Sequence, residues 1–212
     1  MKYIIMCGGK YEKWETDKHL VKINGEPLVA RTIRLLKGYG VRDIAISTNN
    51  DGFGKFGVPV LHHKNPYILP KDHDAETPWL DAFYPTIEPV CYLMGDVVFS
   101  PNAIRTIVET DTDSIEFFAS APPFAKNYCK EWAEPFAFKV KDTKRFFKAI
   151  EDTKRYEKDG WFYRQPVSWE LWQVIKGTRL GRVDYTNYTA INDYTCDIDT
   201  PDDIKYFEGA VD

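Results

Sequence analysis

Short apolar runs alternate with longer amphipathic stretches along most of this chain. Six runs have the length and composition of strands, at residues 2–6, 43–48, 58–63, 90–94, 114–120 and 135–140. Apolar residues recur at helical spacing at residues 27–40, 100–109, 142–155 and 168–177, and a closing helix is predicted at residues 200–209. Strands that alternate with helices predict an α/β fold with a mostly parallel sheet and helices on both faces.

Local signals mark where several of these helices begin and end. Ser100 precedes Pro101, and Thr200 precedes Pro201, which is the pattern of an N-cap followed by proline at the first helical position. The stretch 62–79 is polar, long and punctuated by proline, so it is either a functional loop or an interruption in the pattern of elements. No repeat or linker divides the chain, and a single domain over residues 1–212 is expected.

Composition narrows the function classes. A chain of 212 residues with 43% hydrophobic residues can bury one sizeable core. The net charge of -4 and the scattered basic residues argue against a nucleic-acid surface. No apolar segment has the length of a membrane span or the form of a signal peptide, so no membrane role and a cytoplasmic location are expected. The four cysteines are far apart and form no CxxC pair, which favours free thiols.

The first strand runs directly into the residues CGGK, which are Cys7, Gly8, Gly9 and Lys10. In an open parallel sheet, ligands bind beyond the carboxyl ends of the strands, and the loop after the first strand is the usual phosphate site. Glycines let the backbone approach a ligand closely, and lysines, among them Lys13 and Lys18 further along the loop, supply countercharge. Neither a P-loop nor a GxGxxG motif is present, and an extended phosphate-binding loop is therefore predicted.

Two acidic clusters follow other predicted strands. Asp96 ends the apolar strand at 90–94, and Asp197 and Asp199 alternate along an extended segment so that both face one side. Magnesium keeps much of its coordination for water and phosphate, so two carboxylates from remote positions suffice to hold it. Asp96 with Asp199 is the predicted magnesium pair, with Asp197 as the alternative ligand.

Other polar and aromatic residues leave more than one interpretation open. Thr48 and Asn49 follow the second strand, where they could hydrogen-bond a base or ribose or simply form a turn. His62, His63 and His73 lack the spacing of a metal site. In the segment 160–172, Trp172 is predicted to lie in the core, and Arg164 is assigned neither to the core nor to a ligand pocket.

The order MCGG, DKHLVKINGEPLV, MGDVVF and DIDTPDD resembles the nucleotidyltransferases of the GT-A-like fold, which include sugar-phosphate nucleotidylyltransferases, cytidylyltransferases and the molybdenum cofactor guanylyltransferase. The resemblance spans nearly the whole chain. It implies a Rossmann-like domain in which Gly8, Gly9 and Lys18 contact the nucleotide, and Asp96 and Asp199 bind magnesium. It also implies that residues 1–110 bind the nucleotide and residues 111–212 the acceptor. Inside the loop, Tyr11, Lys13, Trp14 and Glu15 depart from the guanylyltransferase pattern GGxSxRMGxDK.

The expected reaction follows from this resemblance. An acceptor phosphate would attack the α-phosphorus of a nucleoside triphosphate, with magnesium, Lys13 and Lys18 taking up the developing charge and pyrophosphate leaving. The expected partners are a nucleoside triphosphate and a phosphorylated small metabolite, such as a sugar phosphate or an alcohol phosphate, and a homo-oligomer is possible. Two rivals are a GT-A glycosyltransferase, which usually carries Asp-x-Asp where GDVVF has one aspartate, and a non-catalytic nucleotide-binding module.

Overall fold

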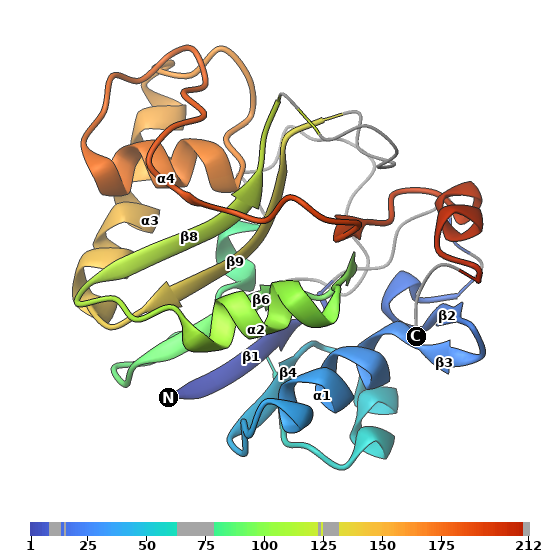
Figure 1. The fold of residues 1–212 in the computed structure, drawn as a ribbon. Coiled ribbons are helices and arrows are strands. Elements are labelled where there is room, and N and C mark those ends of the chain that lie inside the picture. Colours follow the sequence, from blue (N-terminus) through green and yellow to red (C-terminus); the bar gives the residue numbers. More distant parts are fainter. Residues whose placement is uncertain (9–13, 15, 63–78, 123, 125–131, 210–212) are drawn as a thin grey trace.

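The structure is a computed structural model of the 212-residue chain, and it describes residues 1–8, 14, 16–62, 79–122, 124 and 132–209. A seven-stranded sheet runs through the domain in the order β10-β8-β9-β6-β1-β4-β5 (Figure 1). Its strands are β1 (Lys2–Met6), β4 (Ile44–Ser47), β5 (Val60–Leu61), β6 (Val90–Met94), β8 (Ile115–Ser120), β9 (Glu134–Val140) and β10 (Thr189–Ala190).

Most neighbouring strands in this sheet are parallel. The pairs β1–β4, β1–β6, β4–β5 and β8–β10 run in the same direction, whereas β9 is antiparallel to both β6 and β8. The predicted mostly parallel sheet is therefore confirmed, with one reversed strand in its interior. Because β9 is reversed, it begins at the edge of the sheet where β1, β4 and β6 end.

Helices cover both faces of the sheet, as predicted (Figure 1). The alternation of side chains along β1 shows why: Tyr3 and Ile5 belong to one buried cluster, and Ile4 and Met6 to another. The helices α1 (Leu28–Gly38) and α2 (Pro101–Glu109) bury their apolar faces in the first cluster, and α3 (Thr143–Lys158) and α4 (Ser168–Lys176) in the second. Each face of β1 is thus covered by apolar side chains of a different helix pair.

A third, smaller apolar cluster attaches the C-terminal part of the chain. Trp14, Leu28, Val98, Ile198 and Phe207 contribute to it. It joins the hairpin of β2 (Lys22–Ile23) and β3 (Glu26–Pro27) to the pair of β7 (Val97–Val98) and β11 (Cys196–Asp197), which are two short antiparallel pairs outside the main sheet. The cluster holds the acidic segment that begins at β11 against β7, which follows the end of β6.

Two predicted elements differ in extent or type. The strand expected at residues 58–63 is only β5, an edge strand preceded by Pro59, which has no N–H to donate. The closing helix is a six-residue 3₁₀ helix, η4 (Pro201–Tyr206). At its start, Asp203 accepts hydrogen bonds from the backbone N–H groups of Asp199 and Thr200. The other 3₁₀ helices are η1 (Lys18–Leu20), η2 (Asp51–Phe56) and η3 (Leu80–Ala82).

Three further predictions concern segments or properties outside the sheet. Most of the stretch 62–79 lies outside the described residues. Cys7, Cys91 and Cys196 are buried thiols that form no disulfide, as the cysteine pattern predicted, while Cys129 lies outside the described residues. Among the described helices, none has both the length and the apolar content that crossing a membrane requires.

Candidate active site

Three parallel strands end level with one another at one edge of the sheet. The backbone N–H of Cys7, just after β1, donates to Ser47 O at the end of β4 over 2.8 Å, and Gly95 N, just after β6, donates to Met6 O over 3.0 Å. A Cβ added at Gly95 would lie 2.2 Å from Met6 O, so only glycine permits this approach. The contact places Asp96 directly beside the turn that follows β1.

Asp96 forms an ion pair with Lys18 from η1. The Lys18 ammonium lies 2.5 Å from Asp96 Oδ2, and the lysine side chain is only 5% exposed. Burial by itself would raise the pKa of Asp96, but the positive charges of Lys18 and His19 and the hydrogen bond from Lys18 hold that pKa below its usual value. Asp96 therefore stays ionised beside a buried cation.

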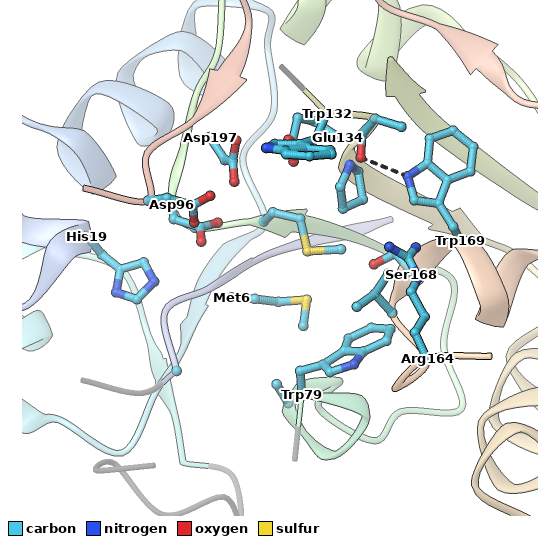
Figure 2. A pocket seen from close by; sticks show the side chains of 18 residues that line it. Met6, His19, Trp79, Asp96, Trp132, Glu134, Arg164, Ser168, Trp169 and Asp197 are labelled. Atoms are coloured by element: carbon cyan, nitrogen blue, oxygen red, sulfur yellow. Dashed lines mark hydrogen bonds between the residues drawn. The ribbon is translucent and has the colours of Figure 1, made fainter. Parts of the chain in front are cut away.

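The other predicted metal ligands lie beside Asp96. Ile198 N donates to Asp96 O over 3.0 Å, and Asp197 in β11 stands opposite Val97 in β7. Burial raises the pKa of Asp197 well above its usual value, and the negative charges of Glu134, Asp96 and Asp199 raise it further. Figure 2 shows Asp96, Asp197 and Glu134 near one another at the end of the cleft. The structure thus brings carboxyl groups from three separate chain segments near Asp197, and one of them, Asp96, is paired with Lys18.

This donor set fits magnesium held jointly with a ligand. Within the described residues, no three side chains of the metal-binding types lie close enough to hold a metal ion by themselves. Magnesium, however, prefers carboxylate oxygens and keeps several positions for water and substrate phosphates.

A buried hydrogen-bond network fixes the segment that carries Asp197. Ser100, the N-cap of α2, donates from Oγ to Asp193 Oδ2 over 2.5 Å, and Thr195 N donates to Asp193 Oδ1 over 2.8 Å. Ser100 N in turn donates to Thr195 Oγ1 over 2.9 Å. The network ties the residues just before β11 to the start of α2, and β11 is therefore held in register with the strand after Asp96.

The carboxylates line one end of a cleft of about 380 Å³ (Figure 2). Its lining combines Gly8, Asp96 and Asp199 with residues from the second half of the chain. Aromatic side chains line other parts of it, namely Trp79, Trp132 and Trp169. Trp132 is 72% exposed, whereas Trp169 is buried and donates from its indole N–H to Ala133 O over 3.1 Å. The cleft is thus apolar and aromatic away from the acidic end.

Arg164 lies across the cleft from the carboxylates (Figure 2). Its Nε donates to Glu170 Oε1 over 2.6 Å, and Glu170 is fully buried and also accepts from Val167 N over 2.9 Å. The guanidinium is therefore held in place by a carboxyl partner that water does not reach. Arg164, which the sequence assigned neither to the core nor to a ligand pocket, lines the cleft. Trp172 lies in the core, as predicted.

The structure brings together some predicted site residues and leaves others apart. Gly8, Asp96, Asp197 and Asp199 line the cleft, and Lys18 contacts it through Asp96. Cys7 is fully buried with its side chain in the core, and Gly9, Lys10 and Lys13 lie outside the described residues. Thr48 is fully buried and accepts a hydrogen bond from Asn50 N, which is turn geometry, and neither Thr48 nor Asn49 lines the cleft, so their nucleotide contacts stay a prediction.

Two residues of the site were not anticipated from the sequence. Glu134 opens β9, and it reaches the strand ends only because β9 is antiparallel, which the apolar pattern of a strand does not reveal. His19 lines the cleft beside Asp96, with its Nδ1 2.5 Å from Asp17 Oδ1. The spacing Asp17-x-His19 next to Lys18 is a local signal that could have identified this pair.

An open α/β sheet with a glycine after its first strand, a buried lysine–aspartate pair and further carboxylates at the strand ends is an arrangement suited to an enzyme that handles nucleotide phosphates. The family described as the MobA-like NTP transferase domain matches residues 3–157. The chain belongs to this family and is a nucleotidyltransferase. A search of the curated proteins finds no match.

Solved structures with the same fold include several nucleotidyltransferases. A protein from Bacillus anthracis named as a glucose-1-phosphate thymidylyltransferase is 17% identical, with a TM-score of 0.58 over 99% of this chain and 94% of its own. HddC from Yersinia pseudotuberculosis, complexed with GMP-PN, is 15% identical, with a TM-score of 0.54 over 99% and 98%. The 4-diphosphocytidyl-2C-methyl-D-erythritol synthase from Anaerococcus prevotii is 11% identical, with a TM-score of 0.59 over 99% and 96%. At these identities the likeness shows the fold.

Proposed function

We propose that this nucleotidyltransferase moves a nucleoside monophosphate from a nucleoside triphosphate onto a phosphorylated small metabolite and releases pyrophosphate, with magnesium as its cofactor. One observation carries the proposal: the buried Lys18–Asp96 ion pair stands at the strand ends with Asp197 and Asp199 beside it. A buried cation together with several carboxylates suits a ligand that brings both phosphate oxygens and a metal ion. Asp96 with Asp199 or Asp197 would hold the magnesium.

In the proposed reaction, an acceptor phosphate oxygen forms a bond to the α-phosphorus, and the bond from that phosphorus to the bridging oxygen of the leaving pyrophosphate breaks. The backbone at Gly8 lets the phosphates approach the sheet edge, and the ammonium of Lys18 offsets their charge. When bound, magnesium would supply further positive charge against the phosphate oxygens. Positioning and electrostatics carry such a transfer, so the chain needs no nucleophile of its own.

The acceptor is assigned to the part of the cleft built by the second half of the chain. Residues 111–212 contribute Trp132, Arg164 and Trp169 to its lining, opposite the carboxylates. The Arg164–Glu170 pair offers hydrogen-bond donors with nearly balanced charge, which suits hydroxyl groups, and indole rings suit the apolar faces of a small ring. These features support a sugar phosphate or alcohol phosphate that extends away from the reacting phosphate. Residues 1–110 are then the nucleotide-binding half.

The proposal is tested by thermal unfolding and pyrophosphate release. The chain is mixed with magnesium and, in turn, CTP, UTP, GTP, ATP or a nucleotide-sugar. A triphosphate present at 100 times its dissociation constant stabilises by about 2.7 kcal/mol, which raises the Tm by roughly 5–11 °C. A shift with the nucleotide-sugar alone would favour a glycosyltransferase instead.

The Asp96→Asn variant tests whether Asp96 is a ligand of the proposed magnesium, apart from whether the chain binds a nucleotide. It keeps the size of the side chain but removes the charge, so pyrophosphate release should fall by a factor of about 100 or more. Asp202→Asn is the matched control, because Asp202 is exposed at the start of η4 and pairs only with Lys205 among the described contacts. Full activity of Asp96→Asn would contradict the assignment of Asp96.

A further inference from the structure

The part of the cleft away from the strand ends carries a single arginine. Arg164 is the only lysine or arginine among the described residues that line the cleft. The acidic residues that line it are Asp96, Glu134, Asp197 and Asp199. Figure 2 shows Arg164 across the cleft from Asp96 and Asp197. An arginine in such a place would ordinarily attract a second anionic group of the ligand, and whether it does so here depends on how its charge is balanced.

Glu170 balances the charge of Arg164 from inside the protein. Its carboxyl group is fully buried, and it accepts from Arg164 Nε over 2.6 Å and from Arg164 Nη2 over 3.4 Å. Val167 N donates to the same carboxyl group over 2.9 Å. Burial acts to lower the pKa of Arg164, but the hydrogen bond to Glu170 and the negative charge of Glu170 raise that pKa above its usual value. The guanidinium therefore stays charged, with an opposite charge directly behind it.

The hydrogen bonds to Glu170 also decide which part of the guanidinium a ligand can reach. Nε and Nη2 donate to Glu170, whereas no described residue accepts a hydrogen bond from Nη1. The arginine side chain is 49% exposed, so its outer end is open to a ligand. The backbone beside it is fixed, because the Trp79 indole N–H donates to Pro166 O over 2.6 Å. Arg164 thus presents the N–H groups of Nη1 and the outer N–H of Nη2 as a fixed fork of donors.

This paired arginine donates hydrogen bonds but attracts an anion less than an unpaired one, because the charge of Glu170 opposes its field. A second anionic group on the acceptor would also lie in a cleft lined by several acidic side chains, and like charges brought together in a binding site cost affinity. A hydroxyl oxygen accepts the same hydrogen bonds without that repulsion. The geometry therefore favours an uncharged group beside Arg164.

We propose that Glu170 determines specificity: by pairing with Arg164 it makes this arginine a donor to uncharged oxygens. The acceptor then carries its negative charge on the reacting phosphate and has hydroxyl groups, not a second anionic group, at its other end. The inference rests on the proposed function and deepens it. Arg164 contacts the acceptor, and Glu170 is a positioning residue that acts through Arg164. Carboxylated sugar phosphates and bisphosphates are poor acceptors on this basis.

The experiment measures the binding of matched phosphate esters to the full chain by titration calorimetry in buffer with magnesium. Glucose 1-phosphate is paired with glucuronic acid 1-phosphate, and glycerol 3-phosphate with 3-phosphoglycerate. Within each pair a carboxylate replaces one hydroxymethyl group, and phosphoethanolamine adds a probe with a cationic end. In the pair that the wild type binds, we expect the hydroxyl member to bind about tenfold more tightly or better, since like-charge contacts are costly.

Three variants separate the charge of Glu170 from its place in the fold. Glu170→Gln keeps the size of the side chain and an acceptor oxygen, and it should shift the preference toward the carboxylate member about tenfold. Adding Arg164→Gln should restore the wild-type preference, because a neutral pair has the same net charge as the ion pair. Glu26→Gln is the control, since Glu26 pairs with Arg34 and neither residue lines the cleft. A purely structural role of Glu170 would weaken both members alike, and the Tm of each variant without ligand checks its fold.

A wild type that binds the carboxylate members as tightly as the hydroxyl members, or phosphoethanolamine more tightly than either, would overturn the inference. An unchanged preference in a folded Glu170→Gln variant would do the same. If that variant does not fold, the double variant decides, and loss of the hydroxyl preference in the neutral pair overturns the inference. A wild type that binds none of these probes removes it too, while the unfolding shift with a triphosphate tests the proposed function separately.

Discussion

Replacing Gly95 by alanine tests how the strand ends assemble the site. An added Cβ would lie 2.2 Å from Met6 O, 2.9 Å from the Met6 carbonyl carbon and 2.8 Å from Cys7 Sγ. Two of these atoms belong to the backbone of β1 and cannot rotate away. A carbon–oxygen contact needs roughly 3.2 Å or more, so the turn after β6 must move by about 1 Å. That movement would carry Asp96 away from the turn after β1.

The size of the effect follows from the contacts that move. Separation of the two turns weakens the hydrogen bond from Gly95 N to Met6 O, a loss of about 1 kcal/mol, and overpacking costs about 1–3 kcal/mol more. A destabilisation of about 2–4 kcal/mol lowers the Tm of a domain of this size by roughly 4–16 °C. A displacement of about 1 Å at a reacting centre also costs roughly 100-fold in rate.

Thermal unfolding and pyrophosphate release measure the two effects separately. Gly38→Ala is the matched control, since a Cβ at this last residue of α1 meets nothing within 4 Å. Alanine is the better helix former, so the control should keep its activity and lose no stability. If Gly95→Ala unfolds at the wild-type temperature and keeps full activity, the close approach of the two turns does not hold the site together.

Three other outcomes are expected. Arg164→Ala should raise KM for the acceptor about tenfold while leaving KM for the triphosphate unchanged, since Arg164 lines the cleft opposite the carboxylates; equal changes in both constants would contradict this role. Phe138→Ala should cost about 3–5 kcal/mol in urea unfolding, because the ring is fully buried among other aromatic rings, and a loss below 1 kcal/mol would refute the packing. Burial acts to raise the pKa of Asp193, but hydrogen bonds from Ser100 and Thr195 bring it below 3.8. Its contribution to stability is therefore present at neutral pH and lost as pH falls through the lowered pKa, so the destabilisation by Asp193→Asn at pH 7 should shrink as the pH is lowered through the acid range, and a loss that does not change with pH would be the wrong result.

Much of the fold was predictable because local pattern and tertiary environment agree. The run KYIIM is apolar on both sides, and β1 is indeed covered on both faces. The N-cap at Ser100 was predicted from its place before Pro101, and its hydroxyl accepts from Ala103 N over 2.8 Å. Asp96 was placed at the glycine turn because parallel strands end at one edge, which the backbone contact between Gly95 and Met6 confirms.

Other features depend on contacts between remote segments. The direction of β9 within the sheet does not follow from its own residues, because an apolar strand pairs equally well either way. Glu134 is therefore found at the site only once the topology is known. The sequence assigns no role to Arg164 for a related reason. Its partner Glu170 is six positions away and buried, and a sequence pattern does not show which charged residues become buried on folding.

The sequence by itself determined the strand and helix pattern and the candidate nucleotide loop, because hydrophobic periodicity and turn chemistry are local properties. The order of its motifs also carried the resemblance to the family. Only the tertiary structure decided that Lys18 pairs with Asp96, that Asp197 stands among three other carboxyl groups, and that His19 faces the cleft with Asp17 behind it. Each of these depends on burial and on distances between segments far apart in the chain. The charge interactions among these side chains set the chemistry of the site, and they exist only after the sheet has brought the strand ends close together in space.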